Sequence, residues 1–144
     1  MSTSDLANEW SILQNQYDSY EKFSLVIKLL SIGVLSFSYF LHQIGLLTLA
    51  LLLILWLQDA IWKTFQSRIS IRLMDVERGL SADPSQSTSP LAAYQYNSVY
   101  ARDRPGLLGL IREYLKHAVR PTIAYPHVVL VGVLVLYFFT GTFF

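Results

Sequence analysis

The fold is decided by two apolar stretches that follow each other closely, FSLVIKLLSIGVLSFSYFL (residues 23–41) and IGLLTLALLLILWLQDAIW (residues 44–62). The first carries one charge, Lys28, and the second carries one, Asp59, near its end. Each stretch has about the length that an α-helix needs to cross roughly 30 Å of hydrocarbon. Only the dipeptide His42–Gln43 separates them, so we predict two membrane-spanning helices joined by a tight turn.

A third apolar stretch covers residues 128–144 and carries no charge. The composition agrees with this pattern, because 53% of the residues are hydrophobic and only 15% are charged, unlike a soluble globular domain. We therefore predict an all-α integral membrane protein with three spans. The first 22 residues are polar and slightly acidic. A signal peptide begins with basic residues, so we expect the first span to be retained.

Positive charges indicate how the chain is oriented. All eleven Lys and Arg residues lie on one side of the proposed membrane or at its edge, and the His42–Gln43 turn has none. Cytoplasmic segments of membrane proteins carry an excess of positive charge. We therefore expect the N-terminus and residues 65–126 in the cytoplasm, and the turn and the C-terminus outside. The expected location is the cell (inner) membrane, which the chain crosses three times.

A seven-residue repeat continues from the polar N-terminal region into the first apolar stretch. One position of the repeat holds Leu6, Leu13, Tyr20, Ile27, Val34 and Leu41, and the companion position holds Trp10, Tyr17, Ser24, Ser31 and Ser38. Such a repeat is typical of a helix that packs along one seam. We predict one helix from about Asp5 to Leu41, in which the small serines let a second helix approach closely inside the bilayer.

The second helix carries a matching apolar stripe beyond the membrane, at Phe65, Ile69, Leu73, Val76 and Leu80. With the turn at His42–Gln43, facing residues of an antiparallel hairpin have numbers that sum to about 86. This rule pairs Leu6 with Leu80, Trp10 with Val76, Leu13 with Leu73, Tyr17 with Ile69 and Ser24 with Trp62. It also places Glu9 opposite Glu77, which is unfavourable.

Residues 1–80 are therefore predicted to form one long helical hairpin with a coiled-coil-like cytoplasmic extension, whose second helix ends at Gly79. The alternative is two transmembrane helices with separate amphipathic flanks on the membrane surface. No proline interrupts the sequence before Pro84. Because proline breaks or kinks a helix, its absence favours the continuous hairpin.

Residues 81–105 are predicted to be a Tyr-rich cytoplasmic loop. The segment opens with the polar linker SADPSQSTSP, and then carries Tyr94, Tyr96 and Tyr100 without a clear period. We expect this loop to pack on the protein or on a partner. Two arginines, Arg102 and Arg104, are too few for the phosphate contacts that nucleic-acid binding requires, so no nucleic-acid partner is expected.

Residues 106–144 are predicted to form an amphipathic helix followed by the third span. The sequence LLGLIREYLKHAVR places Arg112, Glu113 and Lys116 opposite an apolar face of Leu107, Leu108, Ile111, Leu115 and Val119. Such a helix next to a membrane span usually lies in the interface plane. Pro121 and Pro126 are expected to bracket the bend into the third span.

Lys28 and Asp59 are the two ionisable residues well inside the apolar stretches. The hairpin places them at about the same depth, so we expect an intramembrane ion pair between them. Two interpretations remain open. The pair either fixes the register of the hairpin, with Gln58 assisting, or handles an ion or a proton, because ionisable residues are costly to keep in a membrane.

The sequence offers little for catalysis or cofactor binding. Cysteine is absent, and the three histidines, His42, His117 and His127, show no helical metal-ligand spacing. Neither a Gly-x-Ser-x-Gly elbow nor a Gly-rich phosphate loop is present. We therefore expect no enzymatic activity, no metal and no cofactor.

Two classes of function remain. The first is a structural or accessory subunit, or a self-assembling scaffold, of a membrane complex, in contact with lipid and either homo-oligomeric or part of a larger assembly. Candidate interface residues are Trp10, Tyr17, Tyr20, Ser24, Ser31, Ser38, Trp62, Tyr94, Tyr96 and Tyr100. The second is an oligomeric ion channel, pore-former or small transporter, for which the polar positions available are Ser24, Ser31, Ser36, Ser38, Thr48 and Gln58.

The layout of residues 5–80, two close spans followed by a cytoplasmic helical extension, is similar to that of the two-span SLATT-type effectors of bacterial conflict systems. The resemblance implies a function of the second class. It covers layout alone, and the third span departs from it.

Overall fold

The computed structural model describes residues 3–81, 93–103 and 105–141, and these residues form helices and short connections without a strand. The helices are α1 (Thr3–Phe40), α2 (Leu46–Ser81), α3 (Tyr96–Asp103), α4 (Leu107–Ala118) and α5 (Pro121–Thr140). Three of them, α1, α2 and α5, are long and apolar enough to cross a membrane. The all-helical fold and the three long apolar helices that the sequence predicts are thus confirmed.

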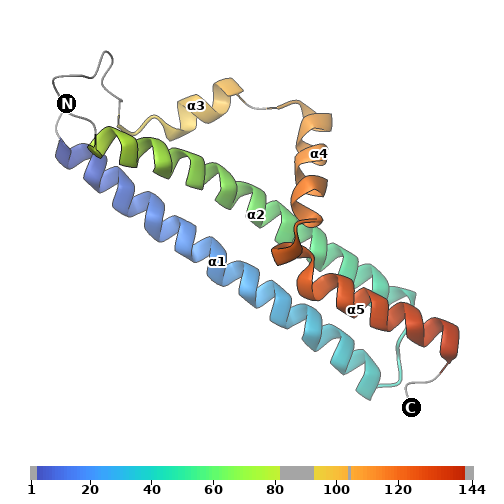
Figure 1. Ribbon diagram of the computed structural model, residues 1–144. Coiled ribbons are helices and arrows are strands. Elements are labelled where there is room, and N and C mark those ends of the chain that lie inside the picture. Colours follow the sequence, from blue (N-terminus) through green and yellow to red (C-terminus); the bar gives the residue numbers. More distant parts are fainter. Residues whose placement is uncertain (1–2, 82–92, 104, 142–144) are drawn as a thin grey trace.

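The two longest helices, α1 and α2, run antiparallel and side by side (Figure 1). The third apolar helix, α5, packs against both of them at the end near their connecting turn. The short helix α4 crosses α2 steeply and leads directly into α5 (Figure 1). We call residues 3–22 and 63–81 the extension, and residues 23–40, 46–62 and 121–140 the apolar half.

The turn between α1 and α2 is closed by a compact helix C-cap. The amide of Gln43 donates to the carbonyl of Ser38 and the amide of His42 to that of Tyr39, both at 3.0 Å. His42 has a φ of 54°, the left-handed conformation that this double hydrogen bond requires. The turn satisfies backbone groups that the end of α1 leaves without partners, and the chain reverses within a few residues.

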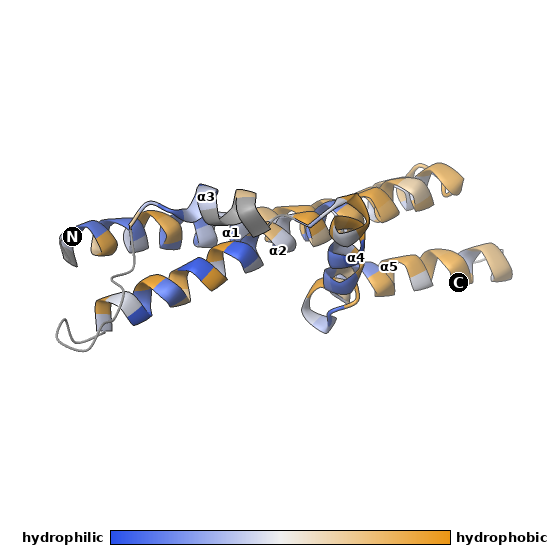
Figure 2. Cartoon of the chain, turned by 90° about the horizontal axis from the view of Figure 1, so that it is seen from above, coloured by the Kyte–Doolittle hydropathy of each residue, from blue (hydrophilic) through white to orange (hydrophobic). Residues whose placement is uncertain are grey.

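Two separate apolar clusters stabilise the hairpin. In the extension, the seam residues Leu6, Leu13, Ile69, Leu73 and Val76 are buried together with Ala93. In the apolar half, Leu35, Leu52 and Leu134 form a second cluster, to which α5 contributes. Figure 2 shows that hydrophobic residues dominate the apolar half, whereas the extension mixes hydrophilic and hydrophobic positions.

The joint between α4 and α5 has its break between the two prolines that were expected to bracket the bend. The helix α5 begins at Pro121, the first helical position, where proline lacks only a hydrogen bond that would be missing anyway. It is interrupted at Tyr125, whose ψ of 131° is extended. The residue before a proline is pushed out of the helical region, so Pro126 explains this break. The helix α5 thus includes several residues before the apolar stretch that begins at residue 128.

Two boundaries differ from the sequence interpretation. The helix α2 continues to Ser81, past the expected end at Gly79. The Tyr-rich segment contains the helix α3 (Tyr96–Asp103), where no periodicity predicted one. Much of the polar linker before it lies outside the described residues.

Candidate functional site

A buried polar cluster built by three helices surrounds Asp59 of α2, whose side chain is fully buried. Ser24 of α1 donates a hydrogen bond to Oδ1 of Asp59 at 2.5 Å. His127 of α5 lies at the other oxygen, with its Nε2 3.3 Å from Oδ2. One ionisable group therefore connects α1, α2 and α5.

Trp56 covers the imidazole of His127. The two rings are nearly parallel, with centroids 6.2 Å apart, and the indole Nε1 donates to the carbonyl of Ala118 at 3.1 Å. His127 Nδ1 is buried and has no hydrogen-bond partner among the described residues. In the same part of the chain, no group of three or more His, Cys, Asp or Glu side chains is placed to hold a metal ion. Chemically, the cluster offers a carboxylate and an imidazole that can exchange a proton.

The structure corrects the expected pairing of Lys28 with Asp59. Lys28 Nζ instead donates to the backbone carbonyl of Thr122 in α5 at 2.9 Å, and both oxygens of Asp59 have other partners. Ser24 occupies the buried seam, whereas Lys28 lies one turn later and is only half-buried. The pairing rule gave depth along a two-helix hairpin, but it did not include the third helix, which supplies partners to both side chains.

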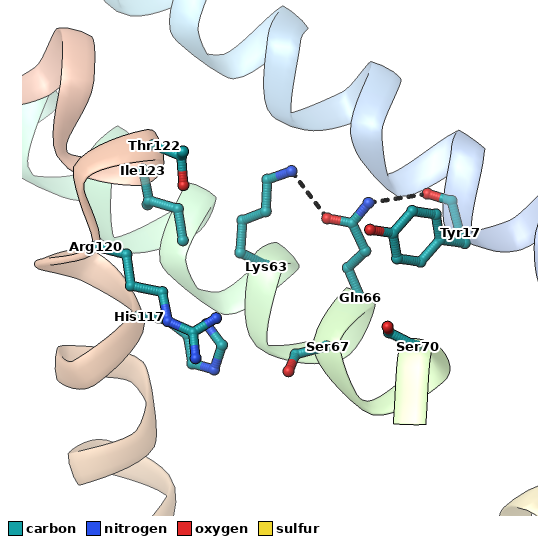
Figure 3. Close-up of a pocket in the computed structure, with 9 residues that line it drawn as sticks. All are labelled: Tyr17, Lys63, Gln66, Ser67, Ser70, His117, Arg120, Thr122 and Ile123. Carbon is teal, nitrogen blue, oxygen red and sulfur yellow. Dashed lines mark hydrogen bonds between the residues drawn. The ribbon is translucent and has the colours of Figure 1, made fainter. Parts of the chain in front are cut away.

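A polar cavity of about 190 Å³ lies between α2 and the α4–α5 joint, with Tyr17 of α1 also in its lining (Figure 3). Its lining from α2 includes Lys63, Ser67 and Ser70, and His117 and Arg120 come from the end of α4 and the joint. His117 is 4% exposed, and its Nδ1 has no hydrogen-bond partner within the described part of the chain. The cavity therefore brings several donors and cationic groups to one place.

The pKa values of two groups at or near this cavity, Glu21 and His117, are shifted from their ordinary values. A hydrogen bond from Lys63 Nζ, 2.6 Å from Oε2 of Glu21, lowers the pKa of that carboxyl below its ordinary value, and a second one from Gln66 acts in the same direction. Burial lowers the pKa of His117, and the positive charge of Arg120 adds to this effect. These contacts thus favour the anionic form of Glu21 and the neutral form of His117.

The aromatic residues predicted for assembly lie mostly within the hairpin of the chain itself. Trp10 donates from its indole nitrogen to Oε1 of Glu77 at 3.0 Å. The rings of Tyr20 and Trp62 pack with centroids 4.9 Å apart, and Tyr17 packs against the apolar cluster of the extension. These side chains therefore stabilise the contact between α1 and α2.

The expected opposition of Glu9 and Glu77 is resolved by a shifted pairing. Glu77 accepts the hydrogen bond from Trp10, while Glu9 forms a two-pronged ion pair with Arg72 at 2.9 Å and 3.1 Å. The side chains of Glu9 and Arg72 are 5% and 8% exposed. A paired and hydrogen-bonded charge is tolerated inside a protein, whereas two facing carboxylates are not.

Part of the Tyr-rich segment packs against the extension. The backbone amide of Tyr94 donates to Oε2 of Glu9 at 2.8 Å, and Asn8 donates to the Tyr94 hydroxyl at 3.0 Å. Tyr96 packs partly buried against the apolar cluster of the extension. The side chain of Tyr100 lies outside the described residues. At Tyr94 and Tyr96 the segment therefore packs on the protein itself.

The three seam serines have different roles. Ser24 reaches across to α2 through its bond to Asp59. Ser31 is fully buried but donates back to the carbonyl of Ile27 in its own helix at 2.9 Å. Ser38 accepts a hydrogen bond from Thr48 at 3.1 Å near the turn. Small size is thus common to all three, while only Ser24 binds a charged group.

Sequence reasoning missed the roles of His117 and His127. One signal was available for His127: it begins the third apolar stretch, as Asp59 ends the second, so both lie at the same edge of the predicted membrane. His117 gave no signal, because the position of α4 relative to α2 depends on the joint around Pro121. Comparisons of this chain with protein-family models, curated proteins and solved structures gave no match.

Proposed function

We propose that this chain is a multi-pass membrane protein that acts as a structural subunit, either self-assembling or within a larger membrane complex. In this proposal α1, α2 and α5 cross the cell (inner) membrane. The extension and α4 are cytoplasmic, and the C-terminus is outside. The three long apolar helices support insertion, and the concentration of Lys and Arg on one side supports the orientation.

The observation that carries the structural role is apolar surface on the extension. Ile12, Ile71 and Met74 are 55%, 57% and 45% exposed in a region that the proposed topology places in water. Ile71 and Met74 lie three residues apart and therefore share one face of α2. Exposed apolar side chains that gather on one face are typical of surfaces that bind another protein.

Native mass spectrometry of the gently solubilised protein tests this proposal. A monomer has a mass of 16.4 kDa, so we expect a discrete multiple of that mass, or co-purifying subunits. Ile71→Glu is expected to weaken the assembly at least about tenfold, because it removes a buried apolar side chain from the interface. Gln16→Glu adds the same charge at another exposed position of the extension and serves as the control.

A monomer at every concentration, without co-purifying protein, would contradict the structural role. So would an Ile71→Glu protein that assembles like the Gln16→Glu control. Substitutions at Trp10 or Tyr17 are less informative, because both side chains take part in packing within the hairpin.

A second candidate function, an oligomeric channel or small transporter, is favoured by the cluster around Asp59. An ionisable side chain kept in an apolar segment is costly and commonly serves ion or proton movement. In this case reconstituted vesicles show a flux that Asp59→Asn abolishes while the protein remains folded and assembled. A structural subunit shows no flux in either form, so the same assay separates the two candidates.

A further inference from the structure

The cavity between α2 and the α4–α5 joint is lined mainly by polar side chains, and one buried polar atom in this lining has no partner among the described residues. His117 Nδ1 is buried and unpartnered among the described residues, and the hydroxyls of Ser67 and Ser70 on α2 face the same space (Figure 3). Buried polar groups are normally hydrogen-bonded, and an exception calls for an explanation. At about 190 Å³, the cavity has several times the roughly 30 Å³ that one water molecule occupies in the liquid.

The charges around the cavity leave an excess of positive charge, to which Lys28 also contributes, because its Nζ lies 2.9 Å from the carbonyl of the lining residue Thr122. Lys63 is neutralised by Glu21, whose Oε2 lies 2.6 Å away. Arg68, on the next turn of α2, is paired with Glu113 of α4 at 2.6 Å. Arg120 lines the cavity and has no ion-pair partner within residues 3–81, 93–103 and 105–141. The cavity is therefore suited to an anionic ligand.

The position of the cavity in the chain indicates which anions reach it. Lys63 directly follows Trp62, whose ring packs with Tyr20 and Phe23 where the second apolar stretch ends. Tryptophan and tyrosine are enriched at the level of lipid headgroups. In the proposed topology the cavity lies at the cytoplasmic surface, where basic pockets next to membrane helices bind anionic lipid headgroups.

We propose that this cavity binds a phosphate group of the kind that an anionic phospholipid headgroup presents. The Arg120 guanidinium pairs with the phosphate oxygens, and the hydroxyls of Ser67 and Ser70 donate to them. A protonated His117 donates from Nδ1, which gives this buried atom a partner. The inference goes beyond the structural role proposed above and is independent of how many copies assemble.

Histidine-selective NMR in lipid nanodiscs tests the proposal, because His117 serves as the reporter. The full-length protein is titrated with pH in phosphatidylcholine alone, in phosphatidylcholine with phosphatidylglycerol, and in phosphatidylcholine with added inorganic phosphate. A bound phosphate stabilises the imidazolium, so we expect the pKa of His117 to rise by about one pH unit. His42, in the turn at the opposite end of the hairpin, reports the general effect of a charged membrane surface in the same sample.

Matched variants locate the effect in the cavity. Arg120→Gln removes the unpaired cation and is expected to abolish the additional rise at His117. Lys116→Gln removes the same charge next to His117 but outside the cavity, and the response is expected to persist. Arg120 and Lys116 are both exposed, so neither substitution disturbs a packed core. Signals are assigned with His117→Gln.

The three conditions distinguish the source of the phosphate. A rise with phosphatidylglycerol identifies the lipid headgroup, and a rise with inorganic phosphate identifies a free anion; either supports the phosphate site. The proposal is overturned if His117 and His42 respond equally in all conditions. It is also overturned if the Arg120→Gln protein keeps the full response, or if Lys116→Gln abolishes it as Arg120→Gln does.

Discussion

The contact between α1 and α2 is built from different kinds of side chain in the extension and in the apolar half. In the extension the seam is mainly apolar, with Leu13, Leu73 and Val76 buried. In the apolar half, fully buried positions include Ser31 and Asp59, while strongly exposed side chains include Phe40, Leu46 and Phe139. The apolar half thus buries small polar side chains beside apolar ones and exposes large apolar side chains, whereas the extension buries mainly apolar side chains.

The proposed topology, with the extension in water and the apolar half in lipid, accounts for this difference. In water, burial of apolar surface drives helix association and is worth roughly 25 cal/mol per Å². In lipid this driving force between helices is absent, so small residues, close packing and hydrogen bonds hold the helices together. Ser24, Ser31 and Thr48 are the small polar residues that such packing uses. The point where the pattern changes, near Phe23 and Trp62, marks the expected membrane boundary.

The largest expected effect concerns the buried charge pair of the extension. Glu9→Ala leaves Arg72 buried without its carboxylate, which typically costs about 3–5 kcal/mol. Hydrogen exchange of peptides from residues 3–22 and 63–81, measured by mass spectrometry in nanodiscs, is expected to accelerate by on the order of a hundredfold or more. The double replacement Glu9→Leu with Arg72→Leu is expected to restore protection, because an apolar pair suits this seam. Acceleration in the double variant equal to that in Glu9→Ala would argue against an apolar seam.

A pair of leucine truncations compares the two regions directly. Leu73→Ala removes a side chain that is 6% exposed in the extension, and we expect a loss of about 2–3 kcal/mol from the transfer and cavity costs. Leu47→Ala removes a side chain that is 74% exposed in the apolar half, where the proposed topology places it against lipid. Lipid tails fill the space that the side chain leaves, so we expect a loss of stability of less than about 0.5 kcal/mol. The same exchange measurement gives both values. Similar losses at the two positions would show that the surroundings of the two regions do not differ as proposed.

Much of the fold follows from short-range patterns that the sequence shows directly. Apolar length predicts the three long helices, because hydrocarbon thickness sets the length of a span. The heptad positions of Leu6, Leu13, Ile69, Leu73 and Val76 indicate which residues are buried together in the extension. The turn is also visible, because only a few residues separate the two apolar stretches.

The candidate site was harder to predict, because it depends on a third helix placed by tertiary packing. The partners of Lys28 and Asp59 come from α5, and no periodicity in α1 or α2 contains that information. The pairing rule gives the depth of a residue along the hairpin, but it does not say which side chains face each other. It therefore could not predict that Glu9 pairs with Arg72. Side-chain hydrogen bonding then selects among nearby registers.

The serines of the seam test whether hydrogen bonding contributes to stability in the apolar half. Ser24→Ala removes the donor to Asp59 Oδ1, and a hydrogen bond to a charged group is worth about 1.5–3 kcal/mol. Ser31→Ala is the matched control, because Ser31 is equally buried but bonds only within α1. We expect a lower thermal midpoint for Ser24→Ala and little change for Ser31→Ala. Equal midpoints would mean that small size alone, and not the contact with Asp59, decides packing here.

The smallest expected effect is a pH dependence in the docking of α4 on α2. Burial and Arg120 lower the pKa of His117 in the folded protein, with Lys116 and Arg68 acting in the same direction and Glu113 opposing them. The imidazole of His117 therefore binds a proton more readily when α4 is undocked than when it is docked. Its contribution to docking is fully present above the ordinary histidine pKa near 6.5 and is lost as pH falls below that value.

Hydrogen exchange in α4, corrected for its intrinsic pH dependence, is expected to be faster at low pH. His117→Gln removes the titrating group and should flatten the profile, whereas an unchanged profile would assign the effect to another group. The measurement uses phosphatidylcholine alone and no added phosphate, because a bound anion is expected to raise the pKa of His117 and reduce the same pH dependence.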